Sequence, residues 1–398
     1  MYLFNTLPER GRALAPGDAA LLGPEGTDAV EGLMGVRAHH GATPLHALPG
    51  LAAALGVGAL HVKDEGRRLG LGSFKALGGA YALMRLVQAE ASRRLDREVP
   101  PEALLSPAVR EIAADMTFAC ATDGNHGRSV AQGAQAMGAT AVIFVHAGVS
   151  ESRIDAIAAF GARIVRTEGT YDDSVAEASR VADEAGWTLL SDTSWPGYEA
   201  VPGLVMQGYT LLVREALQAL PEPPTHVFLQ AGVGGFAAAV AGHLALVLGD
   251  RRPHVTVVEP ERAACLQASA RQGRPVRVEG GGPTVMAMLE CHEASLVAFR
   301  VLGRVADGFM VVDEASAPEA MRMLAEPHAG DLPIVAGESG GAGLAGLLRV
   351  LRAPVLAAEI ALDAEARVLV VNTEGATDPA LYRRLVGRSP EAVLEGEH

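Results

Sequence analysis

Three successive strand-then-helix repeats lie between residues 116 and 191, and they constrain the fold more than any other feature of the chain. Short β-branched or aromatic runs alternate there with longer amphipathic runs, and Gly138, Gly161 and Gly186 directly follow the amphipathic runs. Glycine just past a helix is the expected C-cap, because it adopts the left-handed conformation without a Cβ clash. Strands that alternate with helices of this length predict βαβ units and a parallel sheet.

The pattern predicts two series of elements. In the first series we expect strands at 116–121, 139–145, 162–167 and 187–191, with helices at 126–137, 151–160 and 171–185. In the second we expect strands at 225–230, 254–259 and 366–372, with an Ala-rich helix from about 236. A helix at 201–220 joins the series, and 272–285 is a Gly-rich connection. The sequence therefore predicts two α/β domains.

The charge balance limits the class of partner. Lys and Arg total 33 against 47 Asp and Glu, a formal net charge of −14. Nucleic acids and anionic membranes need a basic face on the protein, so neither is expected as a partner. A phosphate group bound by such an acidic chain is expected to be held largely by backbone N–H groups.

The cysteines and apolar runs point to a cytoplasmic protein. Cys120, Cys265 and Cys291 are too few for a disulfide framework, and no CxxC or HExxH spacing suggests a metal site. Cys265 and Cys291 flank the Gly-rich connection, and free thiols are favoured over a disulfide between them. The N-terminus has no signal-peptide core, and the longest apolar stretch, at 236–249, is too short to span a bilayer.

Polar residues and glycines recur where predicted strands end. In open α/β sheets ligands bind beyond the carboxyl ends of the strands, so these positions are candidates for one shared site. The residues at the strand ends are Asp123, Asn125, His126, Asp192, the loop "AGVGGFAAAV" at 231–240, Thr373 and Glu374. We expect His126 to support its loop rather than to take part in chemistry.

The loop at 231–240 is suited to binding an anion. Gly232, Gly234 and Gly235 let backbone N–H groups converge, and the following helix adds its positive N-terminal dipole. A tight turn kept for packing alone is the alternative. The loop also fits G-x-G-x-x-A, with Glu259 ending a later strand, so a nicotinamide dinucleotide oxidoreductase is a rival hypothesis.

Lys75 decides between these hypotheses. It lies within "GLGSFKALGGAY" at 70–81, among glycines and small residues. A dehydrogenase gives no reason for this lysine, whereas a pyridoxal phosphate (PLP) enzyme needs one in a compact, partly apolar setting that makes its amine nucleophilic. Ser73 would cap the helix that begins here and donate to the phosphate. A surface lysine near a helix start is the alternative interpretation.

Several motifs in order resemble a known family. "GSFKALGGAYA", "TDGNHGRSVA", "VMQGY", "AGVGGFAAAV", "TVMAMLEC" and "NTEGATDP" resemble those of fold-type II PLP enzymes, and most closely the diaminopropionate ammonia-lyase family. The resemblance extends from "ATPLHALPGL" to "TEGATDP". It implies two doubly wound parallel-sheet domains with the cofactor in the cleft between them. Residues 1–74 and 195–398 would form the large PLP-binding domain and 75–194 the small one, in a homodimer.

The resemblance also implies a role for each matching residue. Lys75 would be the Schiff-base lysine and proton carrier, and Asn125 would hydrogen-bond the cofactor's phenolic oxygen. Gly232, Val233, Gly234 and Gly235 would donate backbone N–H groups to the phosphate. Thr373 would place a hydroxyl beside the pyridine nitrogen, and Ser339, within "GESGGAG" at 337–343, would line the cofactor.

Charge underlies the substrate prediction. Serine and threonine dehydratases of this fold tend to carry a serine where this chain has Asp123, and a diamino acid brings an extra ammonium that needs a partner when buried. Asp123 would pair with that ammonium or act as an acid–base group, and Asp192 is a second carboxylate. The implied reaction is elimination of 2,3-diaminopropionate to pyruvate and two ammonia. Strand-end capping is the alternative role of each carboxylate.

Three departures from the family pattern keep a serine/threonine dehydratase open as an alternative. The chain has "LGLGSFK" where the family has a sequence closer to "FGLNAFK". Met288 and His292 stand where glycines are expected. The preferred enantiomer is open, and His39 and His40 are expected in a loop at the site entrance.

Overall fold

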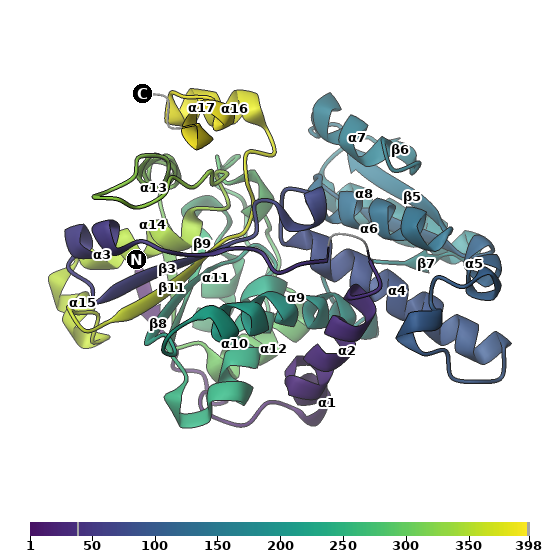
Figure 1. Ribbon diagram of the computed structural model, residues 1–398, viewed down its shortest axis with the longest axis horizontal. Coiled ribbons are helices and arrows are strands. Elements are labelled where there is room, and N and C mark those ends of the chain that lie inside the picture. Colours follow the sequence, from purple (N-terminus) through teal and green to yellow (C-terminus); the bar gives the residue numbers. More distant parts are fainter. Residues whose placement is uncertain (38–39, 396–398) are drawn as a thin grey trace. The chain divides into compact units, whose positions relative to one another are not determined.

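The computed structural model describes residues 1–37 and 40–395 of the 398-residue chain, so His39 lies outside the described residues (Figure 1). The chain divides into two compact units. Unit 1 contains Met1–Pro24, Ala42–Arg67 and the chain from Leu212 onward, and unit 2 contains Glu25–Gly41 and Arg68–Leu211. Unit 2 thus takes in three segments that lie outside 75–194: residues 25–41, 68–74 and 195–211.

Unit 2 is built on a four-stranded sheet whose strands are all parallel, in the order β6-β5-β4-β7. The strands are β4 (Thr117–Ala121), β5 (Thr140–His146), β6 (Arg163–Thr167) and β7 (Thr188–Leu189). The helices are α2 (Pro24–Met34), α4 (Lys75–Arg94), α5 (Pro107–Ala114), α6 (Asn125–Met137), α7 (Glu151–Ala158), α8 (Tyr171–Ala185) and α9 (Ala200–Ala219). Helix α2 begins in unit 1 and α9 ends there.

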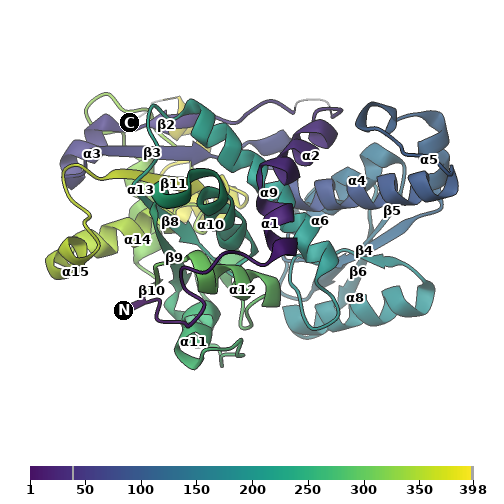
Figure 2. The same cartoon turned by 90° about the horizontal axis from the view of Figure 1, so that it is seen from below.

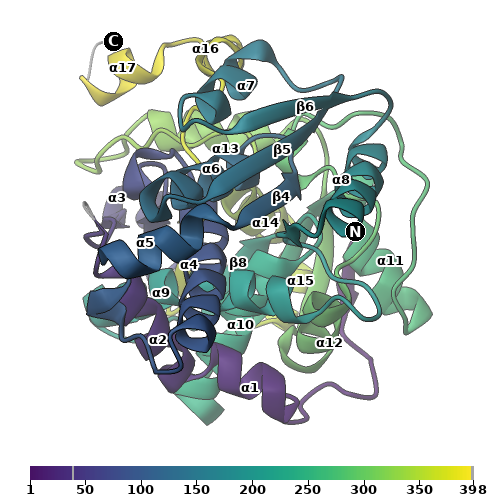
Figure 3. The same cartoon turned by 90° about the vertical axis from the view of Figure 1, so that its right-hand side faces the viewer.

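The strand-and-helix alternation of this unit confirms the prediction, including two of the glycine caps. Gly138 and Gly186 have φ of 81° and 66° and end α6 and α8 in the left-handed conformation. Helix α7 ends at Ala158, three residues before Gly161. Buried side chains of β4 and β5 pack against Ala178 and Ala182 of α8, which covers one face of the sheet (Figure 3).

Unit 1 is built on a seven-stranded sheet in the order β1-β10-β9-β8-β11-β3-β2 (Figure 2). The strands are β1 (Tyr2–Phe4), β2 (Leu45–Ala47), β3 (Ala59–Asp64), β8 (His226–Gln230), β9 (His254–Pro260), β10 (Gly308–Val312) and β11 (Arg367–Asn372). The five central strands are parallel, as predicted for β8, β9 and β11, whereas the edge strands β1 and β2 run antiparallel to their neighbours.

Helices surround this sheet. They are α1 (Pro16–Leu22), α3 (Pro49–Leu55), α10 (Gly235–Leu248), α11 (Cys265–Gln272), α12 (Leu296–Val305), α13 (Ser316–Ala325), α14 (Ala342–Leu351), α15 (Pro354–Glu359), α16 (Pro379–Val386) and α17 (Pro390–Leu394). Single 3₁₀ turns across the two units are Arg68–Gly70, Pro101–Ala103, Gly249–Arg251, Glu261–Ala263 and Ala287–Leu289.

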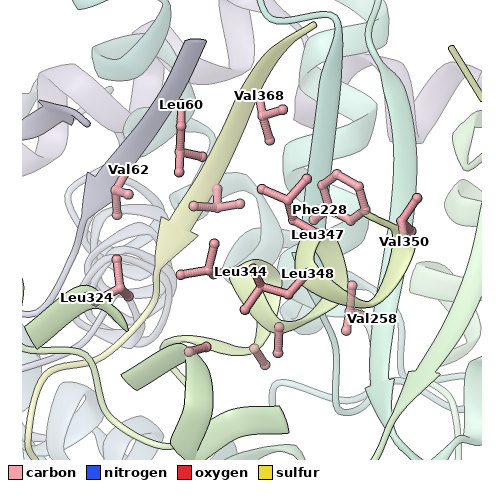
Figure 4. Packing of buried hydrophobic residues seen from close by; sticks show 14 of the residues in the cluster. Leu60, Val62, Phe228, Val258, Leu324, Leu344, Leu347, Leu348, Val350 and Val368 are labelled. Carbon is pink, nitrogen blue, oxygen red and sulfur yellow. The ribbon is translucent and has the colours of Figure 1, made fainter. Parts of the chain in front are cut away.

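The core of unit 1 lies between the sheet and α14. Leu344, Leu347 and Leu348 of that helix belong to the same buried cluster as Phe228 of β8 and Val368 of β11 (Figure 4). Side chains of this kind each contribute about 1.5–3 kcal/mol when fully buried. This packing holds the central strands in place, and therefore also the loops that leave their carboxyl ends.

Two central strands, β3 and β10, are absent from the sequence prediction. In β3 the fully buried Lys63 interrupts the apolar pattern, and its Nζ donates to Glu215 Oε2 at 2.5 Å within unit 1. Strand β10 follows α12 after two residues, Ala306 and Asp307, so the apolar run of the helix and that of the strand merge in the sequence.

Candidate active site

Lys75 is the first residue of α4, in unit 2. Ser73 Oγ accepts the backbone N–H of Lys75 at 3.1 Å, although the N-cap of α4 is Phe74 and no side chain caps the helix in the usual way. The loop before it turns through left-handed residues, among them Gly72 with φ of 77°. Glycine adopts this conformation readily because it has no Cβ.

The amine of Lys75 is held by Asp192, which follows β7. Lys75 Nζ donates to Asp192 Oδ2, and the two side chains are 22% and 11% exposed. Burial alone would raise the pKa of Asp192, but the charge of Lys75 and its hydrogen bond hold that pKa well below its ordinary value. Asp192 is therefore a largely buried carboxylate after β7, and its partner is the lysine itself.

Tyr209 of α9 is a further residue near Lys75. It ends the motif "VMQGY", and the sequence alone predicted no role for it. A Cβ at Gly78 would lie 2.5 Å from Tyr209 Cε1, so glycine one turn after Lys75 is what lets the phenol approach α4. Burial raises the pKa of Tyr209, an effect that the charge of Lys75 opposes. Close approach of α9 explains one of the glycines that follow Lys75.

Asp123 follows β4 and has a partner that sequence reasoning missed. Its Oδ1 accepts from His146 Nε2 at 2.8 Å, and His146 is the last residue of β5. The two strands are parallel neighbours, so their carboxyl ends lie at the same edge of the sheet. The only available signal was a histidine at the end of a predicted strand.

Asn125 and His126 begin α6 in the same loop. Asn125 is half-buried at the first position of the helix. His126 Nε2 lies 2.9 Å from the carbonyl oxygen of Leu190, and burial lowers its pKa, so the ring is neutral near pH 7. This contact ties the loop to the chain beyond β7, in agreement with the supporting role expected for His126.

The glycine loop of unit 1 runs from the end of β8 to the start of α10. Gly234 is the N-cap of that helix with φ of 99°, and no side chain caps it. The first N–H groups of a helix have no partner within it. A Cβ at Gly234 would lie 3.1 Å from Leu266 Cδ1, and one at Gly232 would lie 2.8 Å from Cys291 Sγ. The loop is thus a cradle of backbone donors that side chains would crowd.

Gln230 joins the other unit 1 candidates, and sequence reasoning missed it as well. Its buried Nε2 lies 2.9 Å from the carbonyl oxygens of Gly340 and Val371 and 3.0 Å from Thr373 Oγ1. Ser339 and Thr373 are 1% and 3% exposed. Since Gln230 donates to Thr373, that hydroxyl keeps its own proton for donation to another acceptor.

Met288 and His292 lie in the segment that approaches this cluster. The backbone N–H of Met288 donates to Ser339 Oγ at 3.2 Å. The carbonyl oxygen of His292 accepts from the N–H of Val278 at 2.8 Å, which ties the segment to the Gly-rich connection. The departure at Met288 thus falls beside a residue expected to line the cofactor.

Glu259, which a dinucleotide site would need, is committed to another task. It is fully buried, and its two carboxylate oxygens accept the N–H groups of Leu266 and Gln267 at 2.7 and 2.8 Å, at the start of α11. Burial raises its pKa to about 8. A glutamate occupied in this way is not presented to a ribose, which removes the acidic half of the dinucleotide fingerprint.

The remaining side chains raise no competing site. Cys120, Cys265 and Cys291 are free thiols, as favoured, although Cys291 is only half-buried. Within residues 1–37 and 40–395, no three His, Cys, Asp or Glu side chains gather as a metal ion would require. In the same described part of the chain, every helix is too short or too polar to cross a membrane.

The residues present fit PLP. An amine at the start of α4 and a cradle of backbone donors at the start of α10 are the two groups that an aldehyde-bearing phosphate ester requires. The family described as "Pyridoxal-phosphate dependent enzyme" matches residues 36–374. That match covers most of the chain and defines it as a PLP-dependent enzyme of the fold-type II class.

Two relatives narrow the class. The diaminopropionate ammonia-lyase of Salmonella typhimurium is 40% identical over 364 residues, which are 88% of this chain and 90% of that protein. The crystal structure of the Escherichia coli diaminopropionate ammonia-lyase with an aminoacrylate-PLP azomethine reaction intermediate matches with a TM-score of 0.87 and 36% identity, covering 100% of this chain and 97% of that one. The chain belongs to the diaminopropionate ammonia-lyase family.

The dehydratases are more distant. An L-threonine dehydratase of Haemophilus influenzae is 28% identical over 295 residues, which are 73% of this chain and 49% of that protein.

Proposed function

We propose that this protein is a PLP-dependent carbon–nitrogen lyase that converts 2,3-diaminopropionate and water into pyruvate and two molecules of ammonia. The observation that carries the proposal is the pair of carboxylates, Asp123 and Asp192, in the same unit as Lys75. A substrate with two ammonium groups needs more negative charge at its site than serine or threonine does. Both closely similar relatives bear this activity in their names.

The charged residues of unit 2 take the proton-transfer roles. PLP, when bound, supplies an electrophilic carbon for a primary amine and a ring that takes up the electron pair left at Cα. Lys75 presents the enzyme's own amine at Nζ, and Asp192 orients that amine through the hydrogen bond to Oδ2. Lys75 or Asp123 removes the Cα proton, and the β-nitrogen leaves as ammonia. Asn125 donates to the cofactor's phenolic oxygen.

The neutral groups of unit 1 take the binding roles. Backbone N–H groups of Gly232, Val233, Gly234 and Gly235 hold the phosphate, with the positive end of α10 behind them. Thr373 donates its hydroxyl proton to the pyridine nitrogen, because Gln230 already donates to Thr373 Oγ1. A hydroxyl at that position leaves the nitrogen largely unprotonated, a milder electron sink that suits elimination. Ser339 lines the cofactor.

Asp123 is the residue that distinguishes diamino acids from hydroxy amino acids. The side chain of Asp123 is 27% exposed, and His146 is its partner. Because the carboxylate can still be reached from solvent, it can also accept an ammonium group. A serine there would leave that ammonium without a countercharge, at a cost of several kcal/mol if buried.

The proposed domain organisation and oligomeric state rest on the family resemblance, and the proposed location on the cysteine content and the apolar runs of the sequence. We propose a cytoplasmic homodimer acting in amino-acid catabolism, with 1–74 and 195–398 as the PLP-binding domain and 75–194 as the small domain. Sedimentation equilibrium of the purified protein checks the dimer, since a mass of one chain at all concentrations would contradict it.

The test of function compares substrates in the purified protein reconstituted with PLP. We expect pyruvate and two equivalents of ammonia from 2,3-diaminopropionate, with kcat/KM far above those for serine and threonine. Asp123→Ser should lower kcat/KM for the diamino acid much more than for serine. Turnover of serine or threonine alone would favour the dehydratase, and a protein that never develops a visible absorbance band with PLP would contradict the whole assignment.

A further inference from the structure

The imidazole of His146 contacts the backbone of the turn that follows β5 on one side and the carboxylate of Asp123 on the other. The residue ends β5, one strand over from β4, which leads into Asp123 (Figure 3). The distance from His146 Nε2 to Asp123 Oδ1 is 2.8 Å. Nothing in the proposed reaction so far uses the imidazole.

The turn after β5 fixes which nitrogen carries the proton. The backbone N–H of Gly148 donates to His146 Nδ1 at 3.1 Å, so that nitrogen acts as an acceptor. The neutral ring therefore carries its proton on Nε2 and donates it to Asp123. The N–H of Val149 donates to the carbonyl oxygen of His146 at 3.2 Å and closes the turn.

Gly148 is required for this arrangement. A Cβ at that position would lie 2.7 Å from His146 Cε1 and 3.1 Å from Nδ1, closer than side chains tolerate. The ring is thus held from two directions, by the backbone of its turn and by the carboxylate that it contacts. A histidine that merely covered a sheet edge would need neither.

The hydrogen bond gives the two oxygens of Asp123 different tasks. Oδ1 is occupied by His146, so Oδ2 is the oxygen that can take up a proton or an ammonium group. Arg153 of α7 also lies at this loop, since a Cβ at Gly124 would lie 3.3 Å from Arg153 Cδ. Its stem packs on the turn beside Asp123.

We propose that His146 is a positioning residue for the lyase reaction, holding Asp123 in the one orientation that presents Oδ2 to the substrate. The proposal rests on the function proposed for Asp123. A reacting group misplaced by about 1 Å can cost about 100-fold in rate, so loss of the imidazole should act on kcat more than on KM. His146 itself touches neither the cofactor nor the reacting atoms in this role.

The first experiment measures kcat and KM for each enantiomer of 2,3-diaminopropionate separately, in His146→Leu and His146→Gln. Asp123→Asn first identifies the enantiomer whose turnover needs Asp123. For that enantiomer we expect His146→Leu to lower kcat about 10- to 100-fold with little change in KM. The other enantiomer should be slowed less, because it needs Asp123 only as a countercharge. His146→Gln should restore most of the rate, because the glutamine amide can donate from nearly the same place as Nε2.

Two further variants separate positioning from folding. Asp123→Asn combined with His146→Leu should be no slower than Asp123→Asn alone, because the imidazole acts through the carboxylate. His46→Leu is the matched control: His46 Nε2 lies 3.8 Å from Asp64 Oδ2 in unit 1, with side chains 23% and 17% exposed. It should leave the ratio of the two enantiomers' rates unchanged.

A second readout does not depend on activity. Selective ¹⁵N labelling of histidine, with His146→Leu assigning the signal, should show the Nε2–H tautomer in the wild type and a shifted Nε2 signal in Asp123→Asn. An Nδ1–H tautomer would overturn the proposal even if the protein turned over no diamino acid. This readout therefore distinguishes failure of the role proposed for His146 from failure of the proposed lyase function. Equal slowing of both enantiomers by His146→Leu, with a lowered urea midpoint, would also overturn it by indicating a structural role.

Discussion

Three site residues of unit 2 are charged, whereas those proposed for unit 1 are neutral. Lys75, Asp192 and Asp123 carry full charges, and each meets a charged or ionisable partner in its own unit. The glycine loop, Gln230 and the residues that Gln230 contacts offer only amide and hydroxyl dipoles. This difference explains how a chain with a net charge of −14 can be suited to an anionic cofactor: backbone dipoles bind it, and no cluster of basic side chains is needed.

The comparison separates two kinds of effect. Substitutions in unit 2 should change proton transfer, and therefore kcat, while substitutions in unit 1 should change the affinity for PLP. Both kcat and the affinity for PLP should be measured for the variants below. A unit 2 variant that changes only the affinity, or a unit 1 variant that changes only kcat, would weaken the contrast between the two units.

Lys75→Ala should have the largest effect. Removal of the only amine at the start of α4 eliminates both nucleophile and proton carrier, and acid–base catalysis alone is worth about 10²- to 10⁴-fold. We expect kcat to fall by at least about 10³-fold, with loss of the visible absorbance band. Lys75→Arg keeps a cation beside Asp192 and should lose as much activity while retaining more stability. Full turnover in Lys75→Ala would contradict the chemical role assigned to unit 2.

Asp192→Asn should be the next largest and should also reduce stability. The variant leaves the Lys75 cation without its carboxylate, and breaking a buried ion pair costs about 3–5 kcal/mol. Since Lys75 is 22% exposed, we expect about 3 kcal/mol, measured from the urea midpoint of the PLP-free protein. Glu151→Gln breaks the exposed pair with Arg166 and should leave the midpoint unchanged.

The same variant gives a signed pH dependence. The pKa of Asp192 is lower folded than unfolded, so the ion pair stabilises the folded state above the ordinary aspartate pKa of about 4. That stabilisation is lost as the pH falls from about 4 through the lower, folded-state pKa. The difference in unfolding free energy between wild type and Asp192→Asn should thus be constant from about pH 5 to 7 and shrink below about pH 4. A difference that grows on acidification would contradict the assigned charge state.

What the sequence could predict follows from the same contrast. Asp123 and Asp192 could be proposed as site residues because parallel strands bring their carboxyl ends to one edge, so a polar residue after each strand is informative by its position alone. The glycine loop could be proposed because its residues would act through their backbone, which the residue type reveals. Strand β3 was not predicted, since the buried Lys63 interrupts its apolar pattern.

The side chains that contact the site residues could not be predicted from the sequence, for a physical reason. The contact of Lys75 with Asp192 spans 117 residues and depends on how α4 and β7 pack. His146, Tyr209 and Gln230 are polar residues in or at the ends of regular elements, where most such residues only satisfy local hydrogen bonds. Their roles appear only when the atoms that they reach are known.

Gly234→Ala should act on cofactor affinity instead of rate. A residue with a Cβ at φ of 99° is strained by about 1–2 kcal/mol, and the new methyl would lie 3.1 Å from Leu266 and 3.2 Å from Ala298. We expect PLP to bind about 10-fold more weakly, with kcat at saturating PLP within about 2-fold of the wild type. Equilibrium titration by absorbance measures the affinity.

Gly273→Ala is the matched control for that variant. Gly273 caps α11 with φ of 69°, and a Cβ there would meet nothing within 4 Å. The control should lower the urea midpoint through the same backbone strain but leave the affinity for PLP unchanged. Equal loss of affinity in both variants would mean that strain, and not the shape of the cradle, is responsible.

Thr373→Val should have the smallest effect, and it tests whether unit 1 is purely a binding surface. The variant removes one hydroxyl, but Gln230 Nε2 keeps the carbonyl oxygens of Gly340 and Val371, so the fold should lose little stability. One hydrogen bond is worth about 0.5–1.5 kcal/mol, which corresponds to about a 2- to 10-fold change. If the hydroxyl tunes the pyridine nitrogen, that change should appear in kcat and Thr373→Ser should reverse it. If it appears only in the affinity for PLP, Thr373 belongs with the binding residues of unit 1.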